Sequence, residues 1–185
     1  VFAHRVPRCT LMANRQAVLK PQDLVVATKI AVSQDWPIVY ARLGAELGIS
    51  ASETHACVAR CLAAGLLSKI GSSTEPVRSA LEEFILHGVR YCFPPTFGTA
   101  ALGMPTGASA PALRENFSLD GTDFVWPFTG GTVRGIALYP LYPSVPIAAQ
   151  ADWKLYDVLT LVDAIRAGAA RERELAAIKL RQCLA

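Results

Sequence analysis

The stretch that most constrains the fold is residues 50–67, together with residues 41–49 before it. Ser50 is followed three residues later by Glu53, a pair that satisfies free backbone amides at a helix start. Gly48 comes just before, where the end of a preceding helix needs a residue that tolerates positive φ. Gly65 is placed to end the helix that Ser50 begins. The segment therefore predicts two helices joined by a tight turn.

The second of these helices has two different faces. One face is largely apolar at helical spacing, so we expect it to be buried. It consists of Thr54, Cys57, Val58, Cys61 and Leu62. The opposite face is small and polar, as suits a helix that enters a major groove and reaches base edges. It carries Ser52, His55, Ala56, Ala59 and Arg60.

The motif LGAELGIS at residues 43–50, followed by GLL at residues 65–67, resembles the winged helix–turn–helix of bacterial transcriptional regulators. These include the multiple-antibiotic-resistance-regulator type. The resemblance covers residues 21–86 and implies a DNA-binding fold, usually a dimer, with the helix from Ser50 in the major groove. The same helix geometry also serves as a protein-binding module, and that alternative stays open.

The resemblance also selects candidate DNA-contacting residues. The set is Ser50, Ser52, His55, Ala56, Arg60, Tyr40, Lys69 and Arg78. The small polar members belong near base edges, and Arg60 is expected at a base or a phosphate. Tyr40 is expected either to reach a phosphate or to pack partly buried. Lys69 and Arg78 are the basic residues that the predicted hairpin region offers to the DNA backbone.

Composition sets wider limits. The chain has 185 residues, 52% of them apolar, which suffices for one sizeable domain or a small domain with an extension. A net charge of +3 is compatible with a nucleic-acid partner without requiring one. We find no run of about twenty apolar residues to span a membrane, and no apolar centre of a signal peptide near the N-terminus.

The five cysteines do not indicate a metal site. Their number is odd, their spacing is scattered, and no CxxC motif occurs. Cys57 and Cys61, four residues apart, are expected as small apolar core residues rather than as ligands shared with His55 or His87. The pattern suits a reducing cytoplasm, and we predict a cytoplasmic protein without metal or cofactor.

Four segments are expected along the chain, giving a mainly α fold. Residues 1–20 are expected to form a flexible N-terminal segment. Residues 1–11, before Met12, need not be native; if they are native, they could form a basic arm. Residues 21–93 form the winged helix–turn–helix domain: a helix from Pro21 to about residue 33, a break at residues 35–37, the two central helices, a strand at residues 66–70, a turn at residues 71–76 and a helix at residues 77–93.

Residues 94–150 are expected as a Pro/Gly-rich extended arm. Residues 124–127 and 133–138 flank Thr-Gly-Gly-Thr and predict a short hairpin, while the prolines of residues 141–146 predict a stiff extended segment. So long an irregular stretch should wrap the helical core or bind a partner. The candidate partner-binding residues are Arg134, Tyr139 and Tyr142, with aromatic packing and a surface charge as the alternative interpretation.

Residues 151–185 are expected to be helical. Asp152 is placed to cap a helix whose apolar face is formed by Trp153, Tyr156, Leu159, Val162 and Ile165, and Gly168 to interrupt it. Residues 171–184 then predict an amphipathic helix. We expect this last helix to contribute to a homodimer, by analogy with other winged-helix regulators.

The leading interpretation is a sequence-specific DNA-binding regulator, a dimeric repressor. The alternative is a protein-binding adaptor or antitoxin-like component that uses the middle stretch to hold its partner. An enzyme is not expected. The chain has no P-loop, GxGxxG, HExxH or GxSxG motif, and its histidines have no carboxylate or thiol partner at a catalytic spacing.

Overall fold

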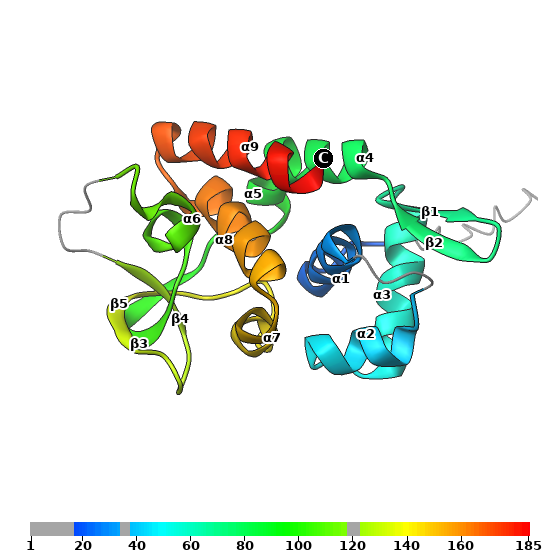
Figure 1. Cartoon of the computed structure of the whole chain (residues 1–185), viewed down its shortest axis with the longest axis horizontal. Helices are drawn as coiled ribbons and strands as arrows, with labels where there is room; N and C mark the ends of the chain where they lie inside the picture. The colour runs from blue at the N-terminus through cyan, green and yellow to red at the C-terminus, as the bar shows by residue number, and fades with distance from the viewer. Residues whose placement is uncertain (1–16, 34–37, 118–122) are drawn as a thin grey trace, which may run out of the picture.

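The computed structural model describes residues 17–33, 38–117 and 123–185. Helices dominate these residues, but two small sheets make the fold mixed α and β (Figure 1), so the predicted mainly α class is only approximate. The N-terminal half contains α1 (Pro21–Val32), α2 (Tyr40–Leu47), α3 (Ala51–Ala63), and a hairpin of β1 (Leu67–Ile70) and β2 (Ser73–Pro76). This order matches the predicted order. The first expected segment lies largely outside the described residues, as does the expected break at residues 35–37.

Helix α1 is the centre of the N-terminal half. Pro21 stands in its first turn, where a missing backbone N–H is tolerated. Nearly every side chain from Asp23 to Ala31 is buried, because α3 packs on one side of α1 and the C-terminal helices pack on the other. The hairpin that follows α3 turns at Gly71, with Leu67 opposite Pro76 and Ile70 opposite Ser73. The predicted turn at residues 71–76 was therefore too long, since most of it is strand β2.

The helix expected at residues 77–93 is present with an irregular middle. It runs as α4 (Arg78–Glu83), a π-helical segment (Phe84–Gly88) and α5 (Val89–Cys92). Gly88 accommodates the wider turn, because a Cβ at that position would lie 2.9 Å from the ring of Phe84. Leu81, Ile85 and Val89 remain on one buried side despite the irregularity.

The middle stretch folds into a small sheet. Strand β3 (Phe97–Pro105) pairs antiparallel with both β4 (Phe124–Pro127) and β5 (Val133–Leu138), while β4 and β5 run parallel to each other and close the sheet on itself. The hairpin predicted for residues 124–138 is therefore wrong. Residues 128–132 cross from the end of β4 to the start of β5, so the two strands point the same way.

Glycines permit this tight closure. A Cβ on Gly103 would lie 2.1 Å from the carbonyl oxygen of Trp126, and one on Gly131 would lie 2.3 Å from the Cα of Gly103. A Cβ on Gly135 would lie 2.3 Å from the carbonyl oxygen of Asp123. Each clash is with backbone that has no room to move, so larger residues at these three positions would force the strands apart.

The remaining elements are helical. They are a 3₁₀ turn (Gly107–Ser109), α6 (Pro111–Arg114), α7 (Val145–Ala151), α8 (Trp153–Ala167) and α9 (Ala170–Leu184). The stiff extended segment predicted for residues 141–146 is wrong, because residues 141–144 form a bend and turn and Val145 and Pro146 form the first turn of α7. The cap at Asp152 is confirmed, since its Oδ1 accepts hydrogen bonds from the backbone N–H groups of Lys154 and Leu155.

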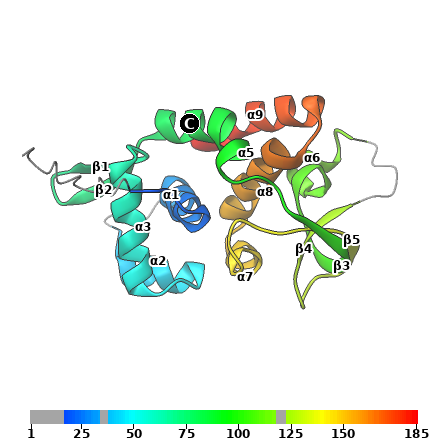
Figure 2. The same ribbon diagram turned by 180° about the vertical axis from the view of Figure 1, so that it is seen from behind.

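Helix α8 joins the sheet to the helical half. Figures 1 and 2 both place it between the sheet and α1, and the buried side chains of the two halves form one continuous core. Residues 94–150 are thus not an arm wrapped around a separate domain. They contribute to the same core as residues 151–185.

A buried polar cluster holds the sheet against α8. Asp163 of α8 is almost fully buried, and its Oδ2 accepts hydrogen bonds from the indole Nε1 of Trp126 at 2.5 Å and from the hydroxyl of Thr106 at 2.8 Å. Its Oδ1 accepts from Nη1 of Arg166 at 2.6 Å, and Arg166 also donates to the carbonyl oxygens of Phe93 and Pro94. Burial raises the pKa of the Asp163 carboxyl, while these donors oppose the shift.

Helix α9 packs along its own chain. Its buried side chains are Ala176, Leu180 and Leu184, and they lie against α8, α4 and α1. Ile178, on another side of the helix, is half exposed. The main apolar stripe of α9 is therefore occupied within the chain. It is not open for the homodimer contact that the sequence analogy predicts for this helix.

Ion pairs also connect the two halves. Nζ of Lys29 in α1 lies 2.8 Å from Oδ2 of Asp152, the cap of α8, and 2.8 Å from Oε2 of Glu46 in α2. The Ser144 hydroxyl donates to the carbonyl oxygen of Leu47 at 2.5 Å. Together these contacts tie α1 and α2 to the start of α7 and α8.

Candidate nucleic-acid interface

The turn between α2 and α3 is built as the sequence predicted. Gly48 has φ of +64°, and the Ser50 hydroxyl accepts a hydrogen bond from the backbone N–H of Glu53 at 3.2 Å. The glycine at position 44, which capping signals do not single out, is equally necessary. A Cβ there would lie 2.6 Å from both the carbonyl oxygen of Ile49 and the hydroxyl of Thr54, so only glycine lets α2 and α3 approach so closely.

The division of α3 into two faces is confirmed. Thr54, Cys57, Val58 and Cys61 are buried, and Leu62 is partly buried. On the other side Ser50, Ser52 and His55 are exposed, Ala56 is partly exposed, and Ala59 is exposed one turn later. The structure thus brings four of the predicted contact residues onto one open strip along α3.

Lys69 extends this surface onto the hairpin. Its side chain is exposed on β1, the strand that follows α3 almost directly. Tyr40 links α3 to the hairpin. Its hydroxyl is 2.9 Å from that of Thr74 in β2, and its ring packs edge-on against the His55 ring, with 5.8 Å between the ring centroids. Of the two roles expected for Tyr40, the structure places it in packing, where it orients His55 and the hairpin.

The expectation that Arg60 contacts DNA is wrong. Its guanidinium forms a bidentate pair with the fully buried carboxylate of Asp23, with Nε to Oδ2 and Nη2 to Oδ1 both at 2.7 Å. Nη2 also donates to Glu53 at 2.7 Å. These hydrogen bonds raise the pKa of Arg60, that to Asp23 most of all, and hold Arg60 against α1.

Helical spacing alone could not separate Arg60 from the exposed strip. The available signal was Asp23, a carboxylate in an apolar stretch of α1 that needs a cationic partner once it is buried. The same pairing explains Glu53. Its carboxylate meets Arg60 and Gln22 rather than the backbone amide of Ser50, so only half of the expected capping box forms.

Arg78 is also engaged within the chain. Its Nη1 donates to the carbonyl oxygen of Leu184 at 2.9 Å, at the end of α9. Although Arg78 is exposed, it belongs to the junction of α4 with α9 and not to the α3 strip. Its predicted contact with phosphate stays a prediction, and the structure does not place it on the surface formed by α3 and Lys69.

The two cysteines of α3 behave as core residues. Cys57 and Cys61 are fully buried, and burial raises the pKa of each thiol to about 12. Such thiols stay protonated near neutral pH and are poor metal ligands. Among residues 17–33, 38–117 and 123–185, no group of three or more His, Cys, Asp or Glu side chains is placed to hold a metal ion.

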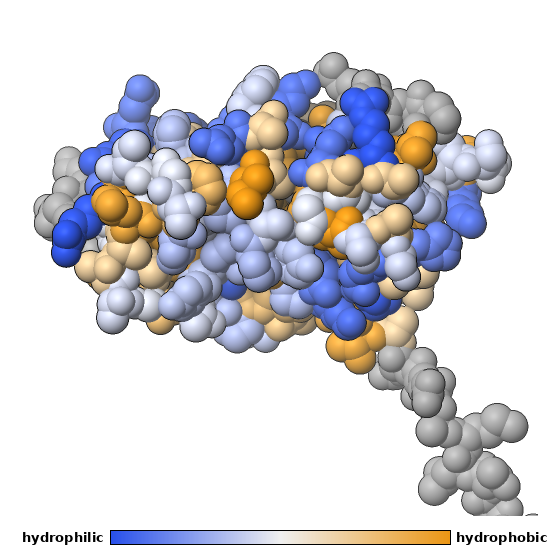
Figure 3. All heavy atoms as spheres, turned by 90° about the horizontal axis from the view of Figure 1, so that it is seen from below, coloured by the Kyte–Doolittle hydropathy of each residue, from blue (hydrophilic) through white to orange (hydrophobic). Residues whose placement is uncertain are grey.

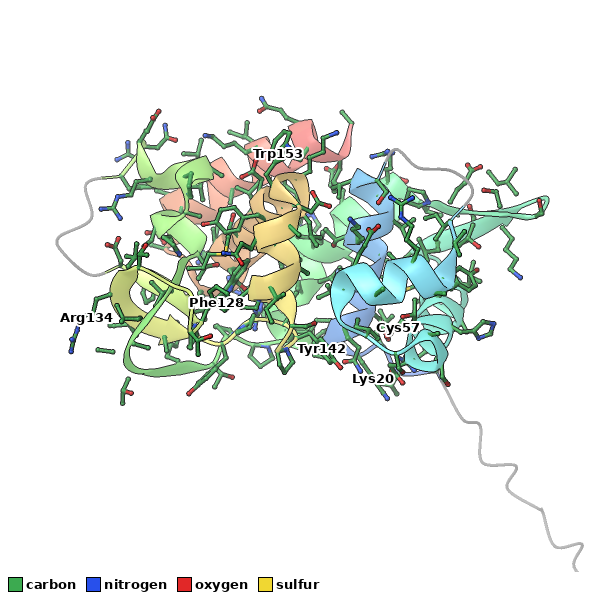
Figure 4. All side chains as sticks on the ribbon, turned by 60° about the horizontal axis from the view of Figure 1, so that its bottom comes forward. Lys20, Cys57, Phe128, Arg134, Tyr142 and Trp153 are labelled. Carbon is green, nitrogen blue, oxygen red and sulfur yellow. The ribbon has the colours of Figure 1, made fainter. Side chains whose placement is uncertain are left out.

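The candidate partner-binding residues separate into two environments. Arg134 is exposed and projects from β5 away from the molecule (Figure 4), and Tyr139 is half exposed just after that strand. Tyr142 instead packs partly buried against the core. Arg134 and Tyr139 are therefore both accessible on the sheet but lie at opposite ends of its pairing with β3, near Leu102 and Thr96 respectively.

Comparisons with protein-family models, with curated proteins and with solved structures found no match to this chain. In the parts of the chain that the structure describes, no helix is both long and apolar enough to cross a membrane. Seen from below, the molecule shows its apolar residues as separate spots among polar ones (Figure 3).

Proposed function

We propose that this protein binds double-stranded DNA through α3 and the β1–β2 hairpin, as a winged helix–turn–helix transcriptional regulator. The observation that carries the proposal is the open strip on α3. It is a 13-residue helix, capped by Ser50 and set at a tight glycine turn against α2, with its polar side free.

The chemistry of the strip suits a major groove. Ala56 and Ala59 are small enough for the helix backbone to come close to the bases, while the Ser52 hydroxyl and the His55 imidazole supply hydrogen-bonding groups for base edges. Lys69 on the hairpin supplies a positive charge for a neighbouring phosphate. The interface that we propose is thus Ser50, Ser52, His55, Ala56 and Lys69.

The regulator that we propose is a cytoplasmic dimeric repressor. A two-fold pair would read a near-palindromic operator, with one α3 in each half-site. This part of the proposal rests on the resemblance alone. A dimer contact would have to use surface other than the buried stripe of α9, and sedimentation of the protein with and without operator DNA measures whether the pair forms.

The test begins with selection of bound sequences from a random duplex pool by the purified chain. Fluorescence anisotropy then measures affinity for the selected duplex at several salt concentrations. Lys69→Ala should weaken binding to all sequences alike and reduce the salt slope by about 1, as loss of one phosphate contact does. His55→Ala should weaken binding by about 1–3 kcal/mol and relax preference at one base position.

Glu83→Gln is the matched control, because Glu83 is exposed on α4 away from α3. It should leave both affinity and salt slope close to those of the original protein. Absence of any anisotropy change at low salt, where nonspecific attraction to phosphates is strongest, would contradict DNA binding altogether.

The sheet surface favours one second candidate, a protein-binding adaptor or antitoxin-like component. Phe97, Leu102 and Tyr139 of the β3–β5 region are each about half exposed, at 49%, 58% and 50%. Arg134 of β5 is the register partner of Leu102 in β3. Exposed apolar side chains of this kind suit a protein contact. Two results together would favour this function: no DNA binding at low salt, and loss of a bound protein partner on the double change Tyr139→Ser and Arg134→Ala.

A further inference from the structure

A cavity lies between the two halves of the molecule, away from the α3 strip. It has a volume of about 280 Å³ and opens between the C-terminal end of α1, the start of α4, the first turns of α8 and the end of α9. Val32 and Val158 supply apolar wall, and the indole of Trp153 stands at the edge. Trp153 is 69% exposed, although helical spacing had placed it on the apolar face of α8. Figure 4 shows it at the first turn of α8 beside α9.

Charged side chains of both signs face this cavity without neutralising one another. Arg78, Lys154 and Asp157 all line it, yet within the described residues no ion pair joins any two of them. Lys154 and Asp157 are three residues apart on α8, a spacing at which such pairs often form. Here the ammonium of Lys154 instead lies over the Trp153 ring, 5.9 Å from its centroid.

Asp157 is the unusual member. It is partly buried, and no described residue donates a hydrogen bond to its carboxylate. Burial raises its pKa, and the charge of Lys179 only partly opposes the shift. A carboxylate in this state gains most from a cation that arrives with its own hydrogen-bond donors. Arg78, whose guanidinium makes one hydrogen bond to the carbonyl oxygen of Leu184, and Lys154 retain donors for an anion.

The geometry points to a binding site for a small zwitterion with an apolar body, the chemistry of an apolar amino acid. Its ammonium would meet Asp157, its carboxylate would meet Lys154 and Arg78, and its side chain would lie between Val158 and Trp153. Neither a simple amine nor a simple acid satisfies both charge sets. A neutral apolar ligand would leave the partly buried carboxylate of Asp157 without a hydrogen-bond donor.

This site does not depend on the proposed DNA binding, and its test contains no DNA. Isothermal titration calorimetry of the full chain compares L-phenylalanine with phenethylamine, which lacks the carboxylate, and with 3-phenylpropionate, which lacks the ammonium. L-Phenylalanine should bind saturably at millimolar concentration or below. Each analogue should bind at least about tenfold more weakly, because each loses hydrogen bonds between charged groups.

Each substitution of a lining charge should weaken only those probes that carry the opposite charge. Asp157→Asn should weaken L-phenylalanine and phenethylamine but leave 3-phenylpropionate unchanged or bound more tightly. Lys154→Gln and Arg78→Gln should weaken L-phenylalanine and 3-phenylpropionate but spare phenethylamine. Glu83→Gln, a charge change outside the cavity, should alter none of the three affinities. Thermal unfolding of each variant shows whether it is folded. If Arg78→Gln does not fold, Lys154→Gln still tests the anion-binding side of the site.

Two results would overturn the inference. The first is no saturable heat with any of the three probes, which would show that the cavity takes no ligand of this class. The second is equal binding of L-phenylalanine and either analogue, or equal loss with all probes in Asp157→Asn. That result would show that the two opposite charges do not act together on one molecule.

Discussion

Each half of the molecule is held by a buried carboxylate–arginine pair, and the two pairs differ in depth. In the N-terminal half Arg60 reaches Asp23 from the edge of the core, and its side chain keeps 16% of its exposure. In the C-terminal half Arg166 and Asp163 keep only 5% and 2%. The shallow pair joins two neighbouring helices, α1 and α3, whereas the deep one gathers donors from β4, the β3 end and α8.

The difference shows what each pair does for the fold. The Asp23 carboxylate accepts from Arg60 and from the neighbouring backbone N–H of Lys20, and Glu53 shares Arg60 at the rim, where water can reach it. The Asp163–Arg166 pair is satisfied only when the sheet, the link after α5 and α8 have all assembled, since the donors to Asp163 and the carbonyl acceptors of Arg166 come from all three. We therefore expect the deep pair to define the cooperative core and the shallow pair to be more tolerant of change.

The largest predicted effect tests the deep pair. Asp163→Ala should lower the free energy of unfolding by about 3–5 kcal/mol, because it leaves Arg166 as an unpaired buried charge and removes the acceptor of Trp126 and Thr106. Urea denaturation followed by circular dichroism measures the change. Asp163→Asn, which keeps the shape but not the charge, should be milder. A loss below about 1 kcal/mol for the alanine variant would mean that the cluster is not a determinant of stability.

The next effect tests whether the shallow pair is structural. Arg60→Ala should lower the free energy of unfolding by about 2–3 kcal/mol, at the lower end for a broken buried pair, because water can reach Asp23 through the opened edge. The same urea experiment measures it. The folded variant should keep its affinity for the selected duplex DNA, since the guanidinium faces α1. A loss of affinity with unchanged stability would return Arg60 to the interface.

These two pairs also mark the limit of what the sequence predicts. In the N-terminal half the cap at Ser50, the turn at Gly48 and the buried stripe of α3 are local signals, and the structure has all of them. Which polar residues are buried is not local. Arg60 pairs with a residue 37 positions earlier in the chain, and helical spacing alone placed it on the wrong side of α3.

The C-terminal half was predicted less well for the same reason. Residues 124–127 and 133–138 do form strands, but their parallel pairing depends on β3, which lies some twenty residues before β4 in sequence. Turn residues at Gly130 and Gly131 favour a hairpin when only neighbours are considered. The close approach of Gly131 to Gly103 explains that glycine by a long-range contact instead.

The smallest effect concerns the ion pairs between the two halves. Bonds from Lys29 and the backbone lower the pKa of Asp152 against the effect of burial, and the bond from Lys29 lowers that of Glu46. Burial would lower the pKa of Lys29, but its bonds to both carboxylates outweigh this and raise it. The contribution to stability is therefore full above about pH 5 and below about pH 10, given ordinary carboxyl and lysine pKa values.

This contribution is lost as pH falls through the lowered carboxyl pKa values, and again as pH rises through the raised pKa of Lys29. Because Glu46 is partly exposed, we expect the whole set to contribute only about 1 kcal/mol. Lys29→Met should remove this part of the pH dependence in thermal unfolding measured from acid to alkaline pH. Lys69→Met, on the exposed hairpin, should retain it. Identical pH profiles for the original protein and Lys29→Met would show that the ion pairs of Lys29 do not contribute to joining the halves.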